Sequence, residues 1–101
     1  MKASFEATLH INSEFVDLNP FVEEFLVRIV TGAVSTLRGA EDIESLELYL
    51  EQGNVRVIVN GAEITLTTFP NDIIANTLIG LVSSLRGVSK VDSLNISVKL
   101  H

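Results

Sequence analysis

Two arginines in a repeated Leu-Arg-Gly segment are the residues of this sequence best suited to binding an anion. Arg38 and Arg86 each follow a leucine and precede a glycine, and a pair of guanidinium groups can hold phosphate or carboxylate oxygens. Each arginine, however, is expected at the carboxyl end of a helix, with Gly39 or Gly87 in the left-handed capping position. Helix carboxyl ends lack the free N–H groups that bind anions. We therefore favour a structural role for both arginines.

Two histidines supply the only imidazole groups for acid–base chemistry or metal binding. His10 is expected on the outer face of the first strand, beside Glu6 and Thr8, and His101 is the last residue. The sequence contains no cysteine, and a metal site needs several ligands that converge. We expect a solvated surface histidine at position 10, and neither a metal site nor a bound cofactor.

A short acidic segment follows the first of the two repeated glycines. Glu41, Asp42 and Glu44 could supply a carboxylate for acid–base catalysis, which also requires a partner in a cleft. The residues that align with them in the second half of the chain are not all acidic: Ser89, Lys90 and Asp92. No nucleophile elbow, phosphate loop or dinucleotide-binding glycine pattern occurs. We interpret the segment as a polar loop, predict no catalytic residue and expect that the protein is not an enzyme.

Composition narrows the classes of partner and compartment. The formal net charge is −6, and the seven basic residues are scattered along the chain, which disfavours both nucleic acid and anionic membranes as partners. The first residues show no apolar signal segment, and no clean apolar span of about 20 residues occurs. The chain is 47% hydrophobic with a mean hydropathy of +0.38, which excludes a disordered protein. Because there is no disulfide framework, we expect a cytoplasmic protein.

The sequence repeats itself with an offset of 48 in residue number. Val34–Gly39 matches Val82–Gly87, and the same shift aligns Asn12 with Asn60 without any gap. Eleven of the 53 aligned pairs are identical, whereas random pairing would give roughly four. Two amphipathic helices that end in glycine could also converge, but the shared serine and arginine are not demanded by amphipathicity. We expect one domain, 1-101, with internal repeats at about 1-52 and 53-101.

Alternating apolar residues predict half-buried strands at 5–11, 46–50, 55–59 and 94–100. Asn60-Gly61 is a favoured centre for a two-residue hairpin, and Gln52-Gly53 can act in the same way. Together they predict a three-stranded antiparallel meander from Leu46 to Thr67, in which Leu50 pairs with Val55, Val59 with Ala62 and Val55 with Leu66. At Asn12-Ser13 the sequence leaves two alternatives open: a hairpin turn, which would pair Leu9 with Val16 and Ala7 with Leu18, or a bulged single strand.

Two helices are predicted, the first from Asn19-Pro20 to Arg38-Gly39 and the second from about Pro70 to Arg86. Gly32 and Gly80 occupy equivalent positions, and we expect them to mark close packing of helix on helix or helix on sheet. The apolar faces of both helices are wider than one sheet face requires. We expect the helices to lie side by side, with part of the apolar surface that the sheet does not cover buried between subunits.

These elements predict an α+β two-layer sandwich. It is a tandem ββαβ duplication with pseudo-twofold symmetry, in which two helices cover one face of a mainly antiparallel sheet. The element order resembles a ferredoxin-like split βαβ pattern over most of the chain, and this resemblance implies one right-handed crossover in each half.

The outer sheet face carries the candidate interaction surface. Strand register places His10 opposite Phe15 and Tyr49 opposite Arg56, with Ile58 nearby. An aromatic and apolar patch within a polar surface can dock a partner, although isolated exposed apolar residues are also normal. We expect a non-enzymatic protein-interaction or self-associating module that forms a homodimer or binds a protein partner. The alternative is a small-molecule-binding regulatory domain with an unknown ligand.

Overall fold

The computed structural model describes residues 5–85 and 90–100, whose strands form one antiparallel six-stranded sheet in the order β2-β1-β6-β3-β4-β5. In chain order the elements are β1 (Phe5–Ile11), β2 (Glu14–Val16), α1 (Pro20–Ser35), β3 (Ser45–Glu51), β4 (Asn54–Val59), β5 (Ala62–Ile64), α2 (Thr68–Ser83) and β6 (Ser93–Leu100). The predicted α+β class is confirmed, with repeated β-β-α units.

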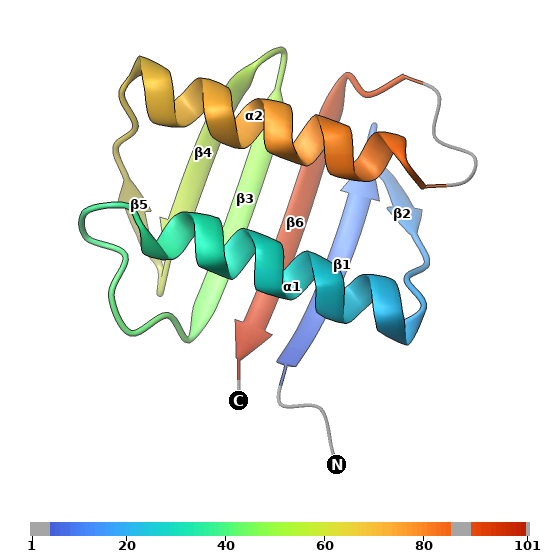
Figure 1. Ribbon diagram of the computed structural model, residues 1–101, viewed down its shortest axis with the longest axis horizontal. Helices are drawn as coiled ribbons and strands as arrows, with labels where there is room; N and C mark the ends of the chain where they lie inside the picture. The colour runs from blue at the N-terminus through green and yellow to red at the C-terminus, as the bar shows by residue number, and fades with distance from the viewer. Residues whose placement is uncertain (1–4, 86–89, 101) are drawn as a thin grey trace.

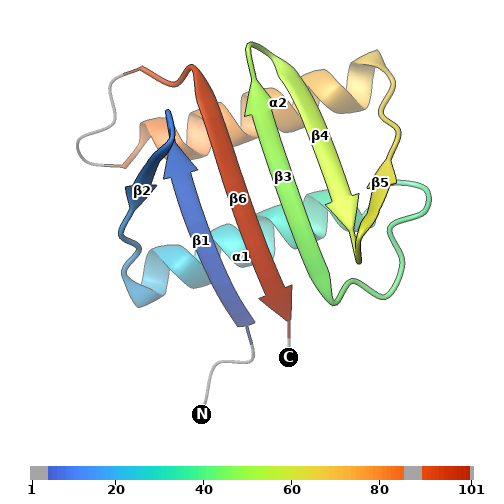
Figure 2. The ribbon, with the colours of Figure 1, turned by 180° about the vertical axis from the view of Figure 1, so that it is seen from behind.

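Both helices cover the same face of the sheet and run in opposite directions (Figure 1). The other face is open, as the reverse view shows (Figure 2). The buried side chains between the two layers are all apolar among the described residues. The fully buried ones include Leu9, Leu26, Leu46, Leu48, Leu78 and Ile96. The strand alternation seen in the sequence therefore sorts one face of each strand into the core.

Two-residue turns set the strand register. Both central residues have positive φ at Asn60-Gly61 (52° and 85°) and at Gln52-Gly53 (49° and 82°), as type I′ hairpins require. The predicted pairs Leu50 with Val55 and Val59 with Ala62 are confirmed. Asn12-Ser13 has the same conformation, with φ of 52° and 69°. The open choice at this position is thus resolved in favour of a hairpin.

The outermost strands are shorter than the sequence predicts. The β1–β2 ladder ends at Leu9 and Val16, so the predicted pair Ala7 with Leu18 does not form. Instead, the backbone N–H of Ala7 donates to Oε2 of Glu23 in the first turn of α1, at 3.0 Å. A carboxylate from the helix thereby replaces a neighbouring strand, because a buried N–H needs an acceptor.

At the opposite edge of the sheet, a helix side chain binds the strand backbone in the same way. The β4–β5 ladder ends at Val57 and Ile64, and the predicted pair Val55 with Leu66 is absent. The N–H of Val55 donates to Oδ1 of Asn71 at 2.8 Å. Val55 and Asn71 are the repeat counterparts of Ala7 and Glu23, so the two repeats use the same device at the two edges of the sheet.

The two central strands of the sheet, β3 and β6, pair with each other through equivalent residues of the two repeats. Leu48 of β3 is paired with Ile96 of β6, and these residues are counterparts in the two repeats. On either side, Leu9 of β1 pairs with Ile96, and Val57 of β4 pairs with Leu48. Because Val57 is the counterpart of Leu9 and Leu48 is the counterpart of Ile96, β1 pairs with β6 in the same register in which β4 pairs with β3.

The helices begin close to the predicted positions and end earlier. Oδ1 of Asn19 accepts the N–H of Val22 at 2.8 Å and caps the start of α1. The helix ends at Ser35, before Arg38, and Gly39 takes a φ of +91° in the following turn. The second helix spans Thr68–Ser83. The predicted end at Arg86 and cap at Gly87 lie outside the described residues.

The expectation of close packing at Gly32 and Gly80 is wrong. Both glycines are exposed, and a Cβ atom built on either one would have no atom within 4 Å. Helical periodicity turns these positions away from the sheet, toward the outer surface of the helix layer.

Candidate functional site

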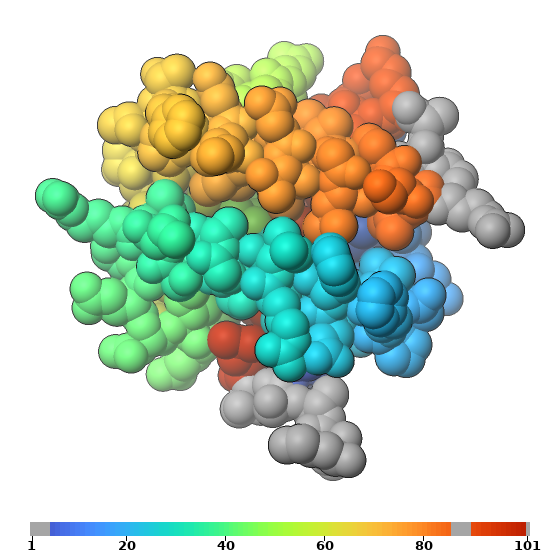
Figure 3. All heavy atoms as spheres, in the orientation of Figure 1, coloured from blue at the N-terminus to red at the C-terminus, as the bar shows by residue number. Residues whose placement is uncertain are grey.

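The outer surface of the helix layer collects most of the exposed large apolar side chains. Among the described residues, four of the five lie on α1 or α2, with exposed fractions of 74% for Phe21, 73% for Phe69, 51% for Ile73 and 46% for Phe25. Phe69 and Ile73 are the repeat counterparts of Phe21 and Phe25, respectively. The layer therefore carries two equivalent apolar pairs, one near the start of each helix. In the space-filling view, α1 and α2 form the face toward the viewer (Figure 3).

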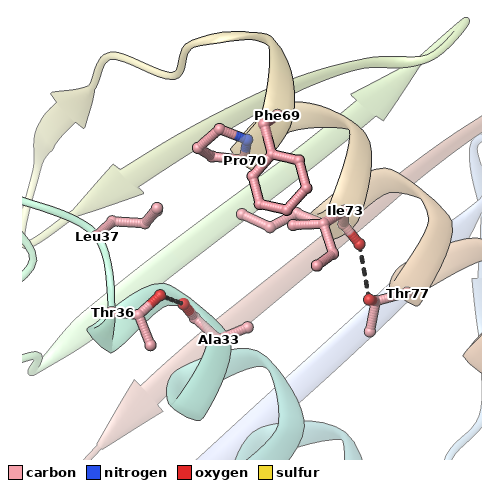
Figure 4. Close-up of a pocket in the computed structure, with 8 residues that line it drawn as sticks. Ala33, Thr36, Leu37, Phe69, Pro70, Ile73 and Thr77 are labelled. Atoms are coloured by element: carbon pink, nitrogen blue, oxygen red, sulfur yellow. Dashed lines mark hydrogen bonds between the residues drawn. The ribbon is translucent and has the colours of Figure 1, made fainter.

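A groove of about 370 Å³ opens between the end of α1 and the start of α2. The lining residues are Ala33, Thr36, Leu37, Phe69, Pro70, Ile73, Ile74 and Thr77. Figure 4 shows the ring of Phe69 and the side chain of Ile73 on the α2 side, opposite Ala33 of α1 and Leu37, which follows that helix. The groove is predominantly apolar, which is typical of sites that bind apolar groups.

The two threonine hydroxyls of the groove are already engaged. Oγ1 of Thr36 donates to the carbonyl of Ala33, and Oγ1 of Thr77 donates to the carbonyl of Ile73, both at 2.7 Å. Each hydroxyl is thus satisfied within its own helix. An occupant of the groove would find mainly carbon surface.

At three positions the groove is lined by a smaller side chain than the equivalent position carries at the other end of the layer. Ala33, Ile73 and Thr77 correspond, through the repeat offset, to three larger residues: Leu81, Phe25 and Ile29. The groove is therefore a difference between the repeats, and the equivalent positions show which larger side chains this helix pair can accommodate.

Few charges lie on the helix layer. The sixteen residues of α2 contain a single charged side chain, Asp72. On α1, Glu24 and Arg28 form an exposed ion pair at 2.8 Å, and Glu23 binds the edge of the sheet. Covering this surface would require little desolvation of charged groups.

The surface predicted on the outer sheet face is brought together only in part. His10 meets Phe15 edge to face, with ring centroids 5.7 Å apart, and the guanidinium of Arg56 lies 5.7 Å from the ring centroid of Tyr49. Asn95 separates the two contacts, since it is paired with His10 on one side and with Tyr49 on the other. Ile58 lies one row away, between two acidic residues: Glu47 and Glu63.

Two shallow hollows flank Tyr49 on this face. One, of about 210 Å³, includes His10, Ser13 and Asn95 among its lining residues, and the other, of about 270 Å³, includes Gln52 and Arg56. The Nδ1 atom of His10 is buried without a hydrogen-bond partner. Since Ser13 is not hydrogen-bonded to that atom, neither hollow offers an activated nucleophile among the described residues.

Hydrogen-bonded and charged partners shift the pKa values of three residues on the outer face: Tyr49, Arg56 and Glu63. The hydroxyl of Tyr49 donates to Oε1 of Glu47, and this hydrogen bond raises the pKa of Tyr49 above its usual value. The guanidinium of Arg56 donates to both carboxylate oxygens of Glu63, which lowers the pKa of Glu63. The same hydrogen bonds to Glu63 raise the pKa of Arg56, and all three shifts arise from surface pairs.

The other residues considered for chemistry have structural positions or lie outside the described residues. The backbone of the acidic loop is bound by the side chain of Asn60, whose Nδ2 donates to the carbonyl of Asp42 and whose Oδ1 accepts the N–H of Glu44. Arg38 is exposed, whereas Arg86 and His101 are outside the described residues. Within residues 5–85 and 90–100, no three histidine, aspartate or glutamate side chains gather as metal ligands would.

Neither described helix is long and apolar enough to cross a bilayer. Comparison of the chain with models of protein families, with curated proteins and with solved structures finds no match.

Proposed function

We propose that this protein is a non-enzymatic, self-associating interaction module that binds through its helix layer. The observation that carries the proposal is the concentration of exposed Phe21, Phe25, Phe69 and Ile73 on one nearly uncharged face. Exposed large apolar side chains that gather on one face of a protein commonly bind a partner.

The exposed apolar area matches what a stable interface needs. From their exposed fractions, these four side chains present on the order of 450 Å² of apolar surface. A standard interface buries about 800 Å² on each partner, of which roughly 450 Å² is apolar. The molecule measures 37 × 35 Å across its two longer axes, so the helix face is large enough for an interface of this size.

The outer sheet face is the weaker candidate for the same role. It carries charged residues in most of its rows, including Glu47, Glu51, Glu63 and Lys99. Covering them would require each charge to find a partner. The apolar part of that face is limited to Phe15, Tyr49 and the half-buried Ile58.

Sedimentation velocity over a concentration series tests the proposal. The wild-type chain is expected to shift from 11.0 kDa toward twice that mass as concentration rises. The double variant Phe21→Ser/Phe69→Ser is expected to weaken association at least tenfold, because buried aromatic residues contribute most to interface energy. Phe15→Ser, which removes an exposed phenylalanine from the sheet edge, is the matched control. A wild-type protein that keeps the mass of a monomer at all concentrations contradicts the proposal.

The finer description of the fold belongs to the same proposal. We infer a tandem duplication whose halves are related by a pseudo-twofold axis at the Leu48–Ile96 pair, with a topology related to the ferredoxin-like split βαβ pattern. The gap-free repeat and the matched registers of β1 with β6 and β4 with β3 support it.

The absence of cysteine supports a cytoplasmic location.

A small-molecule-binding regulatory domain is the second candidate, and the groove is the observation that favours it. Its volume of about 370 Å³ falls within the range of about 300–1,000 Å³ that is usual for ligand pockets. A thermal-shift screen with apolar metabolites would show stabilisation of the wild type. Thr77→Ile places in the groove the residue found at the equivalent position 29 and is expected to abolish that shift. The absence of any stabilising compound would leave this candidate without support.

A further inference from the structure

We infer that the groove receives the phenyl ring of Phe25 from a second copy of this chain, so that two copies join face to face with Phe25 of each beside Ala33 of the other. This inference rests on the proposed function, which it deepens by naming the partner and the contact.

The groove and Phe25 lie toward opposite ends of the helix layer. Ile73 lines the groove at one end of the layer. Phe25, its counterpart in the first repeat, lies in the first half of the antiparallel helix α1, and this helix begins at the end of the layer away from the start of α2 (Figure 1). Two copies that face each other can be related by a twofold axis that lies in the plane of the interface and crosses both helices. Such an axis places each end of the helix layer of one copy over the opposite end of the layer of the other copy. It therefore brings Phe25 of each copy over the groove of the other.

Symmetry then makes the two contacts equivalent. In an interface with twofold symmetry, residue i contacts residue j and residue j contacts residue i. The contact of Phe25 with Ala33 occurs twice, and α1 packs antiparallel on α1 of the second copy. The axis crosses α1 near residue 29, midway between Phe25 and Ala33, and by the repeat offset it crosses α2 near residue 77.

Shape supports phenylalanine as the occupant. A cavity of about 150 Å³ can admit a benzene ring, and the groove offers about 370 Å³ of mainly apolar space. Its α1 wall has Ala33 where the other repeat has Leu81. Phe25 is 46% exposed and stacks at a tilt on Phe21, with ring centroids 6.0 Å apart. Phe25 therefore retains exposed apolar surface that a second molecule can bury.

The surroundings allow the close approach that this contact needs. Gly32 precedes Ala33, and the space where its side chain would be is open. The nearest charges on α1, Glu24 and Arg28, neutralise each other. Neither the position of Gly32 nor the Glu24–Arg28 ion pair therefore opposes the approach of the second copy.

Two substitutions at the contact test the inference by sedimentation. Ala33→Leu installs the residue that the protein already carries at position 81, and it is expected to block the groove and weaken association at least tenfold. Phe25→Ala is expected to weaken it similarly. Thr8→Leu, on the opposite face of the protein, is the matched control and is expected to leave association unchanged. Circular dichroism and urea unfolding establish that each variant is folded.

A cross-link tests the geometry without removing the contact. The chain has no cysteine, so Thr77→Cys introduces a single thiol next to the inferred axis. Two Cα atoms can approach there within the range of about 4.4–6.8 Å that a disulfide needs. Mild oxidation is expected to yield a covalent dimer rapidly, whereas Thr8→Cys is expected to remain monomeric on denaturing gels.

The outcomes separate this inference from the proposed function. If the wild type associates but Ala33→Leu and Phe25→Ala leave the affinity unchanged and Thr77→Cys does not cross-link, the inferred contact is wrong and self-association stands. If Ala33→Leu abolishes the thermal shift caused by a small apolar compound while dimerisation persists, the groove belongs to that compound and the inference is overturned. If the wild type stays monomeric, both proposals fail.

Discussion

Asn12 and Asn60 make the same three side-chain hydrogen bonds, each to the opposite half of the chain. Oδ1 of Asn12 accepts the backbone N–H groups of Asp92 and Ser93, at 2.7 and 3.0 Å, and its Nδ2 donates to the carbonyl of Lys90 at 2.8 Å. Oδ1 of Asn60 accepts the N–H groups of Glu44 and Ser45, at 2.8 and 2.9 Å, and its Nδ2 donates to the carbonyl of Asp42 at 3.0 Å. Every participant in one set is the repeat counterpart of a participant in the other.

This exchange explains why asparagine occupies both positions. Each asparagine has a φ of 52° in a two-residue hairpin, a conformation that asparagine tolerates better than most residues. Its amide supplies both the acceptor and the donor that the loop before the next strand requires. Each repeat thereby fastens the loop that leads into the last strand of the other.

Replacement of either asparagine by alanine is expected to destabilise the fold. The loss of three hydrogen bonds and of a residue suited to positive φ gives an expected cost of about 1–3 kcal/mol in the free energy of unfolding. Asn12→Asp and Asn60→Asp keep the acceptor and are expected to cost less. Urea unfolding measures the effect, and Asn76→Ala, at an exposed position of α2, is the control. Equal stability of Asn60→Ala and the control would contradict the assigned role.

The exposed helix glycines are expected to be replaceable with a gain in stability. A Cβ at Gly32 or Gly80 meets no atom within 4 Å, and alanine favours a helix over glycine by about 1 kcal/mol. Gly32→Ala and Gly80→Ala are therefore expected to raise the free energy of unfolding by about 0.5–1 kcal/mol each at concentrations where the monomer predominates. A decrease at such concentrations would show that these positions are packed within the monomer.

Tyr49 is expected to ionise above the usual value of about 10. Its hydroxyl donates to Glu47, so the neutral phenol is favoured in the folded state and its pKa is raised. This stabilises the fold below the pKa of the unfolded chain, and the contribution is lost as the pH rises through the raised pKa. Because Tyr49 is the single tyrosine and tryptophan is absent, ultraviolet absorbance reports this ionisation alone. Glu47→Gln is expected to lower the pKa, and Glu51→Gln is expected to leave it unchanged.

Glu63 is expected to titrate below the usual value of about 4.3. Arg56 donates to both carboxylate oxygens, so the ionised form is favoured in the folded state and the pKa is lowered. The resulting stabilisation is complete above the pKa of the unfolded chain and is lost as the pH falls through the lowered folded value. Carboxyl chemical shifts measured against pH give the pKa directly. Arg56→Gln is expected to return it toward the usual value, and an unchanged pKa in this variant would exclude the pair as its cause.

Local sequence patterns predicted most of the fold, because strand faces and hairpin turns are determined by residues that are close together in the sequence. Alternating apolar residues and the Asn60-Gly61 pair define β4, its partner strands and their register. Asn12-Ser13 remained ambiguous, since the hydrogen bonds that hold Asn12 come from residues about 80 positions away. The outer strands were overestimated for a similar reason, because Glu23 satisfies the edge N–H from a distance in sequence.

The candidate site was less accessible to sequence analysis. The wide apolar helix faces were recognised, but Phe21 and Phe69 could not be assigned to the core or to the surface without the rotation of each helix on the sheet. Gly32 and Gly80 were assigned to packing for the same reason. The groove depends on the spacing of two helices and on one small residue, Ala33, which periodicity alone does not distinguish from a core alanine.

Amide chemical shifts of the wild-type protein, followed by NMR on serial dilution, test most directly whether the helix layer is the association surface. If it is, concentration-dependent changes are expected in α1 and α2, largest around Phe25, Ala33 and Thr77, with little change at Tyr49 and Arg56. Changes confined to the outer sheet face, or none over the full range of concentrations, would contradict the proposed surface.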